Sequence, residues 1–126
     1  MRAALNDNSP IYLQVKEAIE EEILSGALMP DEQIPSNRQL VKLWEVNPMT
    51  VLKGVGLLAD EGILYKKRGE GMFVALDAKE TLKRRLGESF RAERLEPVVR
   101  LADSLGMPLS ELLKQVQDVW EGIHND

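Results

Sequence analysis

Lysine and arginine side chains are concentrated in the middle of this chain, where they could bind an anion. Six of them lie between Ile34 and Val74 against four acidic residues, although the whole chain has a net charge of −5. The six are Arg38, Lys42, Lys53, Lys66, Lys67 and Arg68. Phosphate groups bind to positive surfaces, so the net charge argues against a nucleic-acid ligand, while the distribution of the charge favours one.

Residues suited to catalysis or metal binding are scarce. The chain has no cysteine and one histidine, His124, which excludes disulfides, thiolate metal sites and cysteine nucleophiles. The glutamates at 20–22 are neighbours, so they splay around a helix instead of converging on one face. Gly69 and Gly71 lie between predicted strands, whereas the glycines of a phosphate-cradling loop precede a helix. We therefore predict no enzyme activity, no metal site and no cofactor.

The length and composition are those of a small globular protein. With 126 residues the chain has room for one ordinary domain, or for one small domain with an appendage. Hydrophobic residues make up 44% and charged residues 29%, which is the balance of a soluble protein. No apolar run approaches the roughly 18 residues of a membrane span, and residues 1–10 lack the apolar segment of a secretory signal. We expect a cytoplasmic location.

Apolar periodicity and capping residues predict three helices before residue 63. A Ser-Pro pair at 9–10 has the residue types of an N-cap and a first helical residue, and apolar residues follow at helical spacing. Ser36 with Gln39 three residues later is a capping-box signature, and an Asn-Pro pair at 47–48 opens another helix. The predicted helices cover residues 10–25, 36–44 and 48–62.

A hairpin is predicted directly after the third helix. Residues 63–67 and 72–76 have the composition of strands, and the segment 68–71 between them is basic and contains two glycines. Two short helices joined by a tight turn are typical of a helix-turn-helix, and a hairpin after them is a wing. The predicted fold is mainly α with a small β-hairpin, in which residues 1–76 form an N-terminal winged helix-turn-helix domain.

The remaining residues, 77–126, are predicted to be helical. A capping box at 77–80 opens a fourth helix, which Pro97 should interrupt or kink. Gly106 has the residue type of a helix C-cap, and Pro108 opens a last helix with apolar residues along one side. These residues form a second, short helical region.

The segment from Pro10 to Val74 resembles the DNA-binding domain of the GntR family. Five sequence blocks match in order: PIYLQV, SGALMP, IPSNRQL, VNPMTV and LADEGILYKKRGEGMFV. One block alone is weak evidence, but five in register over roughly half the chain are specific. The Asn-Pro pair and a C-terminal part too short for the family's larger effector domains resemble the YtrA-like subfamily, whose members are dimeric repressors.

The resemblance implies contacts with double-stranded DNA. Arg38 matches a family arginine that contacts DNA, and a guanidinium can bridge phosphates or read guanine. Thr50 matches a threonine that faces the DNA, and Gly69 and Gly71 match wing glycines that let the backbone approach a groove. The predicted DNA-binding residues are Ser36, Arg38, Asn47, Met49, Thr50, Lys53, Lys66, Lys67, Arg68, Gly69 and Gly71.

The same resemblance implies that residues 77–126 form a homodimer interface, because the subfamily pairs its protomers through two C-terminal helices. The predicted dimerisation residues are Leu82, Leu86, Phe90, Leu109, Leu112, Leu113, Val116 and Trp120.

The third helix also departs from the family pattern. Pro48 stands where many members carry an arginine, and Leu52 lies near the position of another, so the family's base preferences do not transfer. Gly54 and Gly56 replace alanine-like or larger residues, and each glycine costs about 1 kcal/mol in a helix interior. We expect close packing against the first or second helix to compensate.

Several side chains have alternative interpretations. Arg38 could be solvated or could pair with Glu45, and the basic residues at 66–68 could protect an edge strand from aggregation. Asn47 is first of all a helix cap. The basic residues at 83–85 are typical of a solvated helix face.

The function predicted from these features is that of a sequence-specific, DNA-binding transcription regulator, a repressor by resemblance, bound to a pseudo-palindromic operator as a homodimer. One alternative is a winged-helix adaptor that binds proteins. Another is a regulator whose C-terminal helices directly sense a small-molecule effector. Trp44 and Trp120 are expected in the core or an interface, not against a ligand.

Overall fold

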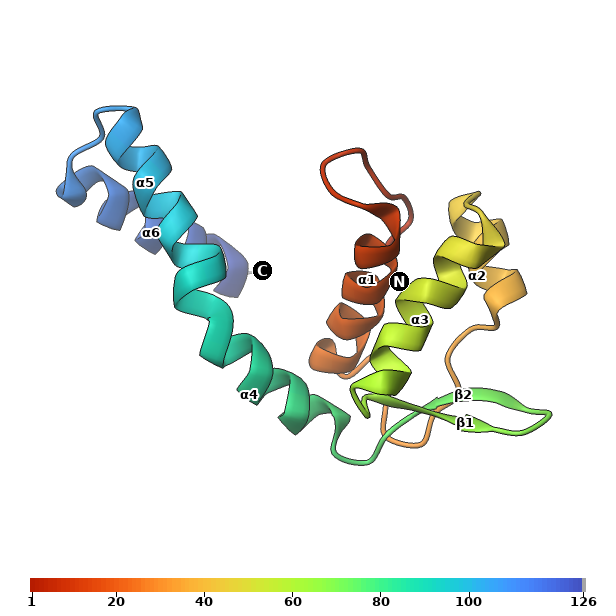
Figure 1. Ribbon diagram of the computed structural model, residues 1–126. Coiled ribbons are helices and arrows are strands. Elements are labelled where there is room, and N and C mark those ends of the chain that lie inside the picture. The colour runs from red at the N-terminus through yellow and green to blue at the C-terminus, as the bar shows by residue number, and fades with distance from the viewer. Residues whose placement is uncertain (126) are drawn as a thin grey trace. The chain divides into compact units, whose positions relative to one another are not determined.

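The computed structural model describes residues 1–125 and is mainly helical with one two-stranded antiparallel sheet, as predicted (Figure 1). In chain order the elements are α1 (Ile11–Ser25), α2 (Asn37–Trp44), α3 (Pro48–Asp60), β1 (Leu64–Lys67), β2 (Gly71–Val74), α4 (Ala78–Phe90), the π-helical turn η1 (Arg91–Leu95), α5 (Glu96–Ser104) and α6 (Leu109–His124). The chain divides into two compact units. We call Met1–Arg85 the N-terminal unit and the chain from Leu86 onward the C-terminal unit.

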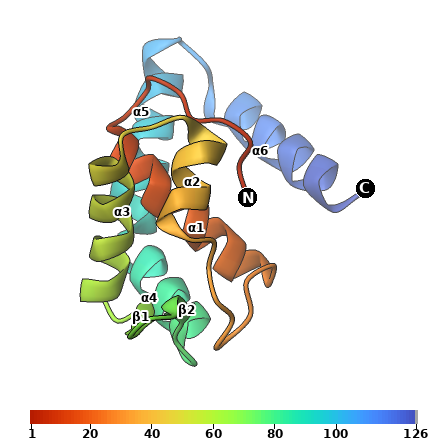
Figure 2. The ribbon, with the colours of Figure 1, turned by 90° about the vertical axis from the view of Figure 1, so that its right-hand side faces the viewer.

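The core of the N-terminal unit lies between α1, α2 and α3, of which α1 and α3 pack side by side (Figure 2). A Cβ atom on Gly54 of α3 would lie 2.7 Å from the Tyr12 carbonyl oxygen of α1, so the expected close packing is confirmed there. It is wrong for Gly56, whose added Cβ would meet nothing within 4 Å. The buried apolar side chains of this core include Val15, Ala18, Ile19, Leu40, Val51, Leu58 and Ile63.

The starts of α2 and α3 follow the predicted caps. Ser36 Oγ accepts from the Gln39 amide at 3.1 Å, and the Gln39 side chain accepts from the Ser36 amide at 2.8 Å, which completes the capping box. Asn47 Oδ1 accepts from the Met49 amide at 2.8 Å, and Pro48 is the first residue of α3. These bonds satisfy amides that a helix start otherwise leaves without partners.

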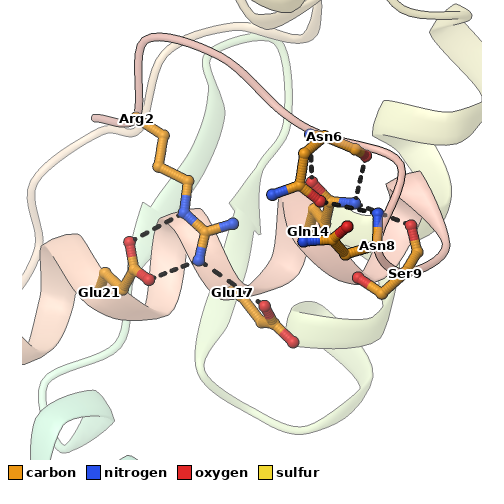
Figure 3. Close-up of polar contacts among 7 residues, drawn as sticks. All are labelled: Arg2, Asn6, Asn8, Ser9, Gln14, Glu17 and Glu21. Carbon is orange, nitrogen blue, oxygen red and sulfur yellow. Dashed lines mark hydrogen bonds and ion pairs between the residues drawn. The ribbon is translucent and has the colours of Figure 1, made fainter.

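The start of α1 lies one residue later than predicted. Pro10, with an extended backbone, is the N-cap, and its carbonyl accepts the first helical bonds. The preceding segment is held by the buried side chain of Gln14 instead of a Ser9 cap (Figure 3). Gln14 Nε2 donates to the Asn6 and Ser9 carbonyls at 2.7 and 2.8 Å, and its Oε1 accepts from the Asn6 amide at 2.9 Å.

The hairpin pairs β1 with β2 in the register Leu64↔Val74, Tyr65↔Phe73, Lys66↔Met72 and Lys67↔Gly71. Each strand is one residue shorter than predicted: β1 begins one residue later, and β2 begins one residue earlier but ends at Val74, because residues 75–77 already lead into α4. Paired residues point to the same face and neighbours to opposite faces. Leu64 and Val74 are buried, so the face they share with Lys66 and Met72 is turned toward the core.

The boundary between the units lies at residues 85 and 86, later than the predicted boundary at 76 and 77. The reason is that Ala78 and Leu82, on the first turns of α4, are buried in the N-terminal unit. Leu82 is 0% exposed in the single chain, so its predicted role at a dimer interface is wrong. It is a core residue of the winged domain.

The C-terminal unit is built from helices with little burial. The interruption predicted at Pro97 takes the form of η1, a π-helical turn directly before the proline-bearing start of α5. Proline lacks the amide hydrogen of a regular turn, which accounts for the altered spacing. Gly106 ends α5 with φ +71°, while Met107 donates to the Ala102 carbonyl at 3.0 Å, as in a Schellman motif.

Candidate nucleic-acid interface

The turn between α2 and α3 presents the first turn of α3 to solvent. Glu45 ends α2 in a left-handed conformation, with φ +52°, and the chain then enters α3 through Asn47. Met49 is 69% exposed and Thr50 is half-buried beside it. The Asn47 Oδ1 atom already caps the Met49 amide. The hydrogens of the Asn47 side-chain amide are therefore the groups that remain available to a ligand.

The start of α2 contributes Ser36 and Arg38, both exposed. The Ser36 oxygen accepts the capping bond from Gln39, and its hydroxyl hydrogen can still be donated to a phosphate. Within residues 1–125, Arg38 forms no ion pair with Glu45, so that alternative is not supported. The guanidinium is therefore available to an anion.

The basic residues of the hairpin do not act as one patch, because they alternate between its two faces. Lys66 is exposed at the edge of the face that is turned toward α3. Lys67 lies on the opposite face, with its Nζ atom 4.2 Å from the centre of the Phe73 ring. Arg68 is exposed in the turn. Of these three basic residues, Lys66 and Arg68 are exposed and Lys67 is half-buried.

The two hairpin glycines differ in what surrounds them. Gly69 has φ +79°, and an added Cβ would meet nothing within 4 Å, so the backbone there is open to a groove. Gly71 has φ +128°, and an added Cβ would lie 2.7 Å from Nε2 of Gln33. Gln33 also donates to the Glu70 carbonyl. Gly71 thus makes room for a side chain that braces the tip, a contact that the sequence did not predict.

A cleft of about 390 Å³ lies between α3, the start of α2 and the hairpin. Gly56 opens onto it, together with Leu52 of α3 and Met72 of β2. This accounts for the lack of close packing at Gly56. The cleft separates α3 from the wing.

One cluster of charges was missed by sequence reasoning, which took residues 83–85 for a solvated face. Arg85 Nη1 lies 2.8 Å from Glu61 Oε1, and Lys16 Nζ lies 3.3 Å from Glu61 Oε2 and 3.2 Å from Glu20 Oε2. Burial is the main cause that raises the pKa of Glu20 from 4.5, although the neighbouring Lys16 acts in the opposite direction. The cluster joins α1, the end of α3 and α4.

The ammonium group of Lys53 lies over an aromatic ring. Lys53 is exposed on α3, and its Nζ atom lies 3.9 Å from the centre of the Tyr12 ring on α1.

Among residues 1–125, no group of three or more histidine, cysteine or acidic side chains could hold a metal ion. Over the same residues, no helix is both long enough and apolar enough to cross a membrane.

The remaining predicted dimerisation residues lie on exposed helical faces. Leu86 and Leu112 are half-buried, and the others are exposed: Phe90, Leu109, Leu113, Val116 and Trp120. Leu112, Val116 and Trp120 border a shallow apolar cleft of about 330 Å³ with α5, in which Gln115 is the only polar lining residue among those described. That lining does not supply the convergent polar groups of a small-molecule site.

The two tryptophans lie in different environments, and the histidine lies beside one of them. Trp44 is buried, and its indole nitrogen donates to the Arg2 carbonyl at 2.9 Å, so it is a core residue as expected. Trp120 is 64% exposed and stacks on His124 with ring centres 4.4 Å apart. His124 is the last residue of α6.

Three helices followed by a hairpin, with polar and basic side chains exposed on the second and third helices and at the hairpin tip, define a winged helix-turn-helix. Residues 11–74 match the family described as bacterial regulatory proteins, gntR family. The chain belongs to this GntR family. It is a transcription regulator and not an enzyme.

Two relatives that are transcriptional repressors agree with the assignment to the GntR family. The HTH-type transcriptional repressor YtrA of Bacillus subtilis is 30% identical over 89% of this chain and 85% of its own length, which confirms the YtrA-like resemblance. The HTH-type transcriptional repressor NagR of the same organism is 33% identical over 75% of this chain. The match covers only 40% of NagR.

Solved structures show the same fold. A GntR family transcriptional regulator from Listeria monocytogenes superposes with a TM-score of 0.73 at 26% identity, covering 90% of this chain and 98% of that one. The crystal structure of AraR(DBD) in complex with operator ORX1 has a TM-score of 0.55 at 36% identity. It covers 57% of this chain and 94% of AraR(DBD).

Proposed function

We propose that this protein is a cytoplasmic transcription repressor that binds a pseudo-palindromic DNA operator as a homodimer. The observation that carries the proposal is the joint exposure of Arg38, the first turn of α3 and Arg68 on one winged domain. A winged domain of the same fold has been solved with operator DNA, in the AraR(DBD) complex. The first turn of α3 enters the major groove, and the wing tip contacts phosphates or the neighbouring minor groove.

Ten of the eleven predicted DNA-binding residues remain in the proposed contact surface. Arg38 and Asn47 supply donors for phosphates or base edges, while Met49 and Thr50 offer apolar and hydroxyl contacts. Gly71 is left out, because Gln33 occupies the space beside it. The surface comprises Ser36, Arg38, Asn47, Met49, Thr50, Lys53, Lys66, Lys67, Arg68 and Gly69, with Lys67 the least accessible of the lysines.

The proposal of a homodimer is supported by the apolar seam of α6. Leu109, Leu112, Val116, Val119 and Ile123 follow one another at alternating spacings of three and four residues, which is the spacing of a coiled-coil seam. None of these side chains is buried in the single chain. A second copy of the same helix would cover them. Two protomers then place two readers about one DNA turn, roughly 34 Å, apart.

Selection of bound duplexes from a random pool tests the proposal directly. We expect a two-fold symmetric consensus, and an affinity that falls steeply as salt is raised, because bound phosphates release their counterions. A protein-binding adaptor would select no consensus and bind DNA weakly at any salt concentration. That outcome would end the proposal.

Arg38→Ala should weaken operator binding by about 1–3 kcal/mol if Arg38 reads a base. Arg84→Ala is the matched control, since Arg84 is an exposed arginine outside the proposed surface. Fluorescence anisotropy with the selected duplex measures both variants. Wild-type affinity in Arg38→Ala would remove Arg38 from the interface.

A further inference from the structure

We infer that Tyr12 is a positioning residue for DNA binding, because its ring holds the ammonium group of Lys53 beside the duplex backbone. The inference rests on the proposed function. It concerns a residue of α1, a helix that contributes none of the predicted DNA contacts.

The local geometry begins with Gly54. A side chain there would collide with the Tyr12 carbonyl and with Val15 Cγ1, at 2.7 and 2.8 Å, so only glycine lets α3 pack this closely on α1. Lys53 is the neighbour of Gly54 on α3, and this approach brings its Nζ atom to 3.9 Å from the centre of the Tyr12 ring. The glycine that weakens the helix therefore also creates the contact.

The contact restricts a side chain that is otherwise free to move. Tyr12 is half-buried and its ring is rigid, whereas Lys53 is exposed and carries its charge on a flexible stem of four methylene groups. A cation over an aromatic face is attracted by the ring quadrupole. Ordering such a side chain at an interface costs free energy, and a free protein that already holds it in place binds more tightly.

The direction of Lys53 indicates a phosphate as its partner. Lys53 is three residues after Thr50 and four after Met49, so it shares the face of α3 that carries the proposed base contacts. The ring draws its ammonium group toward α1, at the edge of that face. A lysine ammonium acts as a point charge, which suits a phosphate at the edge of the groove.

The test compares full-length wild type with Tyr12→Leu, Tyr12→Phe, Lys53→Gln and the double variant Tyr12→Leu/Lys53→Gln. Affinity is measured for the selected operator and for an unrelated duplex over a range of salt concentrations. We expect Tyr12→Leu to lose about two- to tenfold in affinity per protomer, equally on both duplexes, while Tyr12→Phe keeps the ring and the affinity. Lys53→Gln should lower the slope of log affinity against log salt by about one per protomer.

The double variant separates positioning from ordinary packing. If Tyr12 acts through Lys53, Tyr12→Leu has no further effect in the Lys53→Gln background. An equal loss in both backgrounds, or a loss in Tyr12→Phe as large as in Tyr12→Leu, would overturn the inference while leaving the proposed function intact. Failure of the wild type to bind any duplex would instead overturn the proposed function.

A second measurement does not depend on how well the leucine variant folds. In the wild-type protein, the side-chain methylene protons of Lys53 next to the ammonium group should show an upfield NMR shift from the Tyr12 ring. Tyr12→Phe should preserve this shift. Shifts typical of a solvated lysine in the wild type would show that the ring does not hold Lys53, and would overturn the inference.

Discussion

The two units of this chain differ sharply in how they bury apolar side chains. Among residues 1–125, every buried apolar side chain except Ala102 belongs to the N-terminal unit. The C-terminal unit also contains large apolar side chains, but it exposes them along α5 and α6. Burial of apolar surface is the main favourable contribution to folding. The N-terminal unit therefore contains its own core, and we propose that the C-terminal unit completes its core with a second copy.

Charged substitutions on α6 should have the largest effect. Leu112→Glu combined with Val116→Glu places like charges on both sides of the proposed dimer seam, so we expect monomers and a loss of operator affinity of about a hundredfold or more. The fold of the winged domain should be unchanged. Sedimentation equilibrium and anisotropy measure the two effects.

The control for this experiment is Leu76→Glu, which changes an exposed leucine of the N-terminal unit. It should leave the protein dimeric. Dimers that persist in the α6 variant would place the interface elsewhere and remove the proposed difference between the units.

Leucine-to-alanine changes should destabilise the two units in different ways. Leu58→Ala leaves a cavity in a closed core and should cost about 2–5 kcal/mol at any protein concentration. Leu109→Ala changes a side chain that is 68% exposed in the single chain, so its cost should appear only through dimerisation and depend on protein concentration.

Urea denaturation at two protein concentrations measures both variants, with the fluorescence of buried Trp44 reporting on the N-terminal unit. If Leu109→Ala lowers the stability equally at both concentrations, the C-terminal unit has a core of its own.

Adding one methyl group should distinguish dense from open packing. Gly54→Ala forces the new Cβ against α1 and should destabilise the protein by about 1–3 kcal/mol. Gly87→Ala, on the part of α4 in the C-terminal unit, meets nothing within 4 Å and should stabilise it by up to about 1 kcal/mol. Thermal unfolding measures both, and a destabilising Gly87→Ala would contradict the open packing.

The smallest expected effect is the pH dependence contributed by Glu20. Its folded pKa is raised above 4.5 by burial, so the folded protein binds more protons than the unfolded chain just above that pH. Stability should therefore fall as the pH rises from about 4.5 through the raised folded pKa.

Glu20→Gln should remove this decrease, whereas Glu88→Gln, at an exposed position in the C-terminal unit, should preserve it. Urea denaturation at several pH values gives the comparison. An unchanged slope in Glu20→Gln would assign the dependence to another group.

Much of the fold was predictable because its signals are local. Capping at Ser36 and Asn47 depends on residues two or three positions away, and the hairpin on glycines within its own turn. The start of α1 was displaced by one residue, since Gln14 binds backbone groups of a segment that precedes the helix. Arg85 was misassigned because its partner Glu61, at the end of α3, is 24 residues away, and Leu82 because its burial depends on the packed N-terminal unit.

The amino-acid sequence by itself determined the family, the order of helices and strands, and the set of polar and basic residues on the second helix, the third helix and the wing. Only the tertiary structure decided that Gly71 accommodates Gln33 and that Tyr12 meets Lys53. The physical reason is the distance along the chain over which each interaction acts. Caps and periodicity act between residues a few positions apart, whereas these contacts require α1, α3 and the hairpin to be packed first.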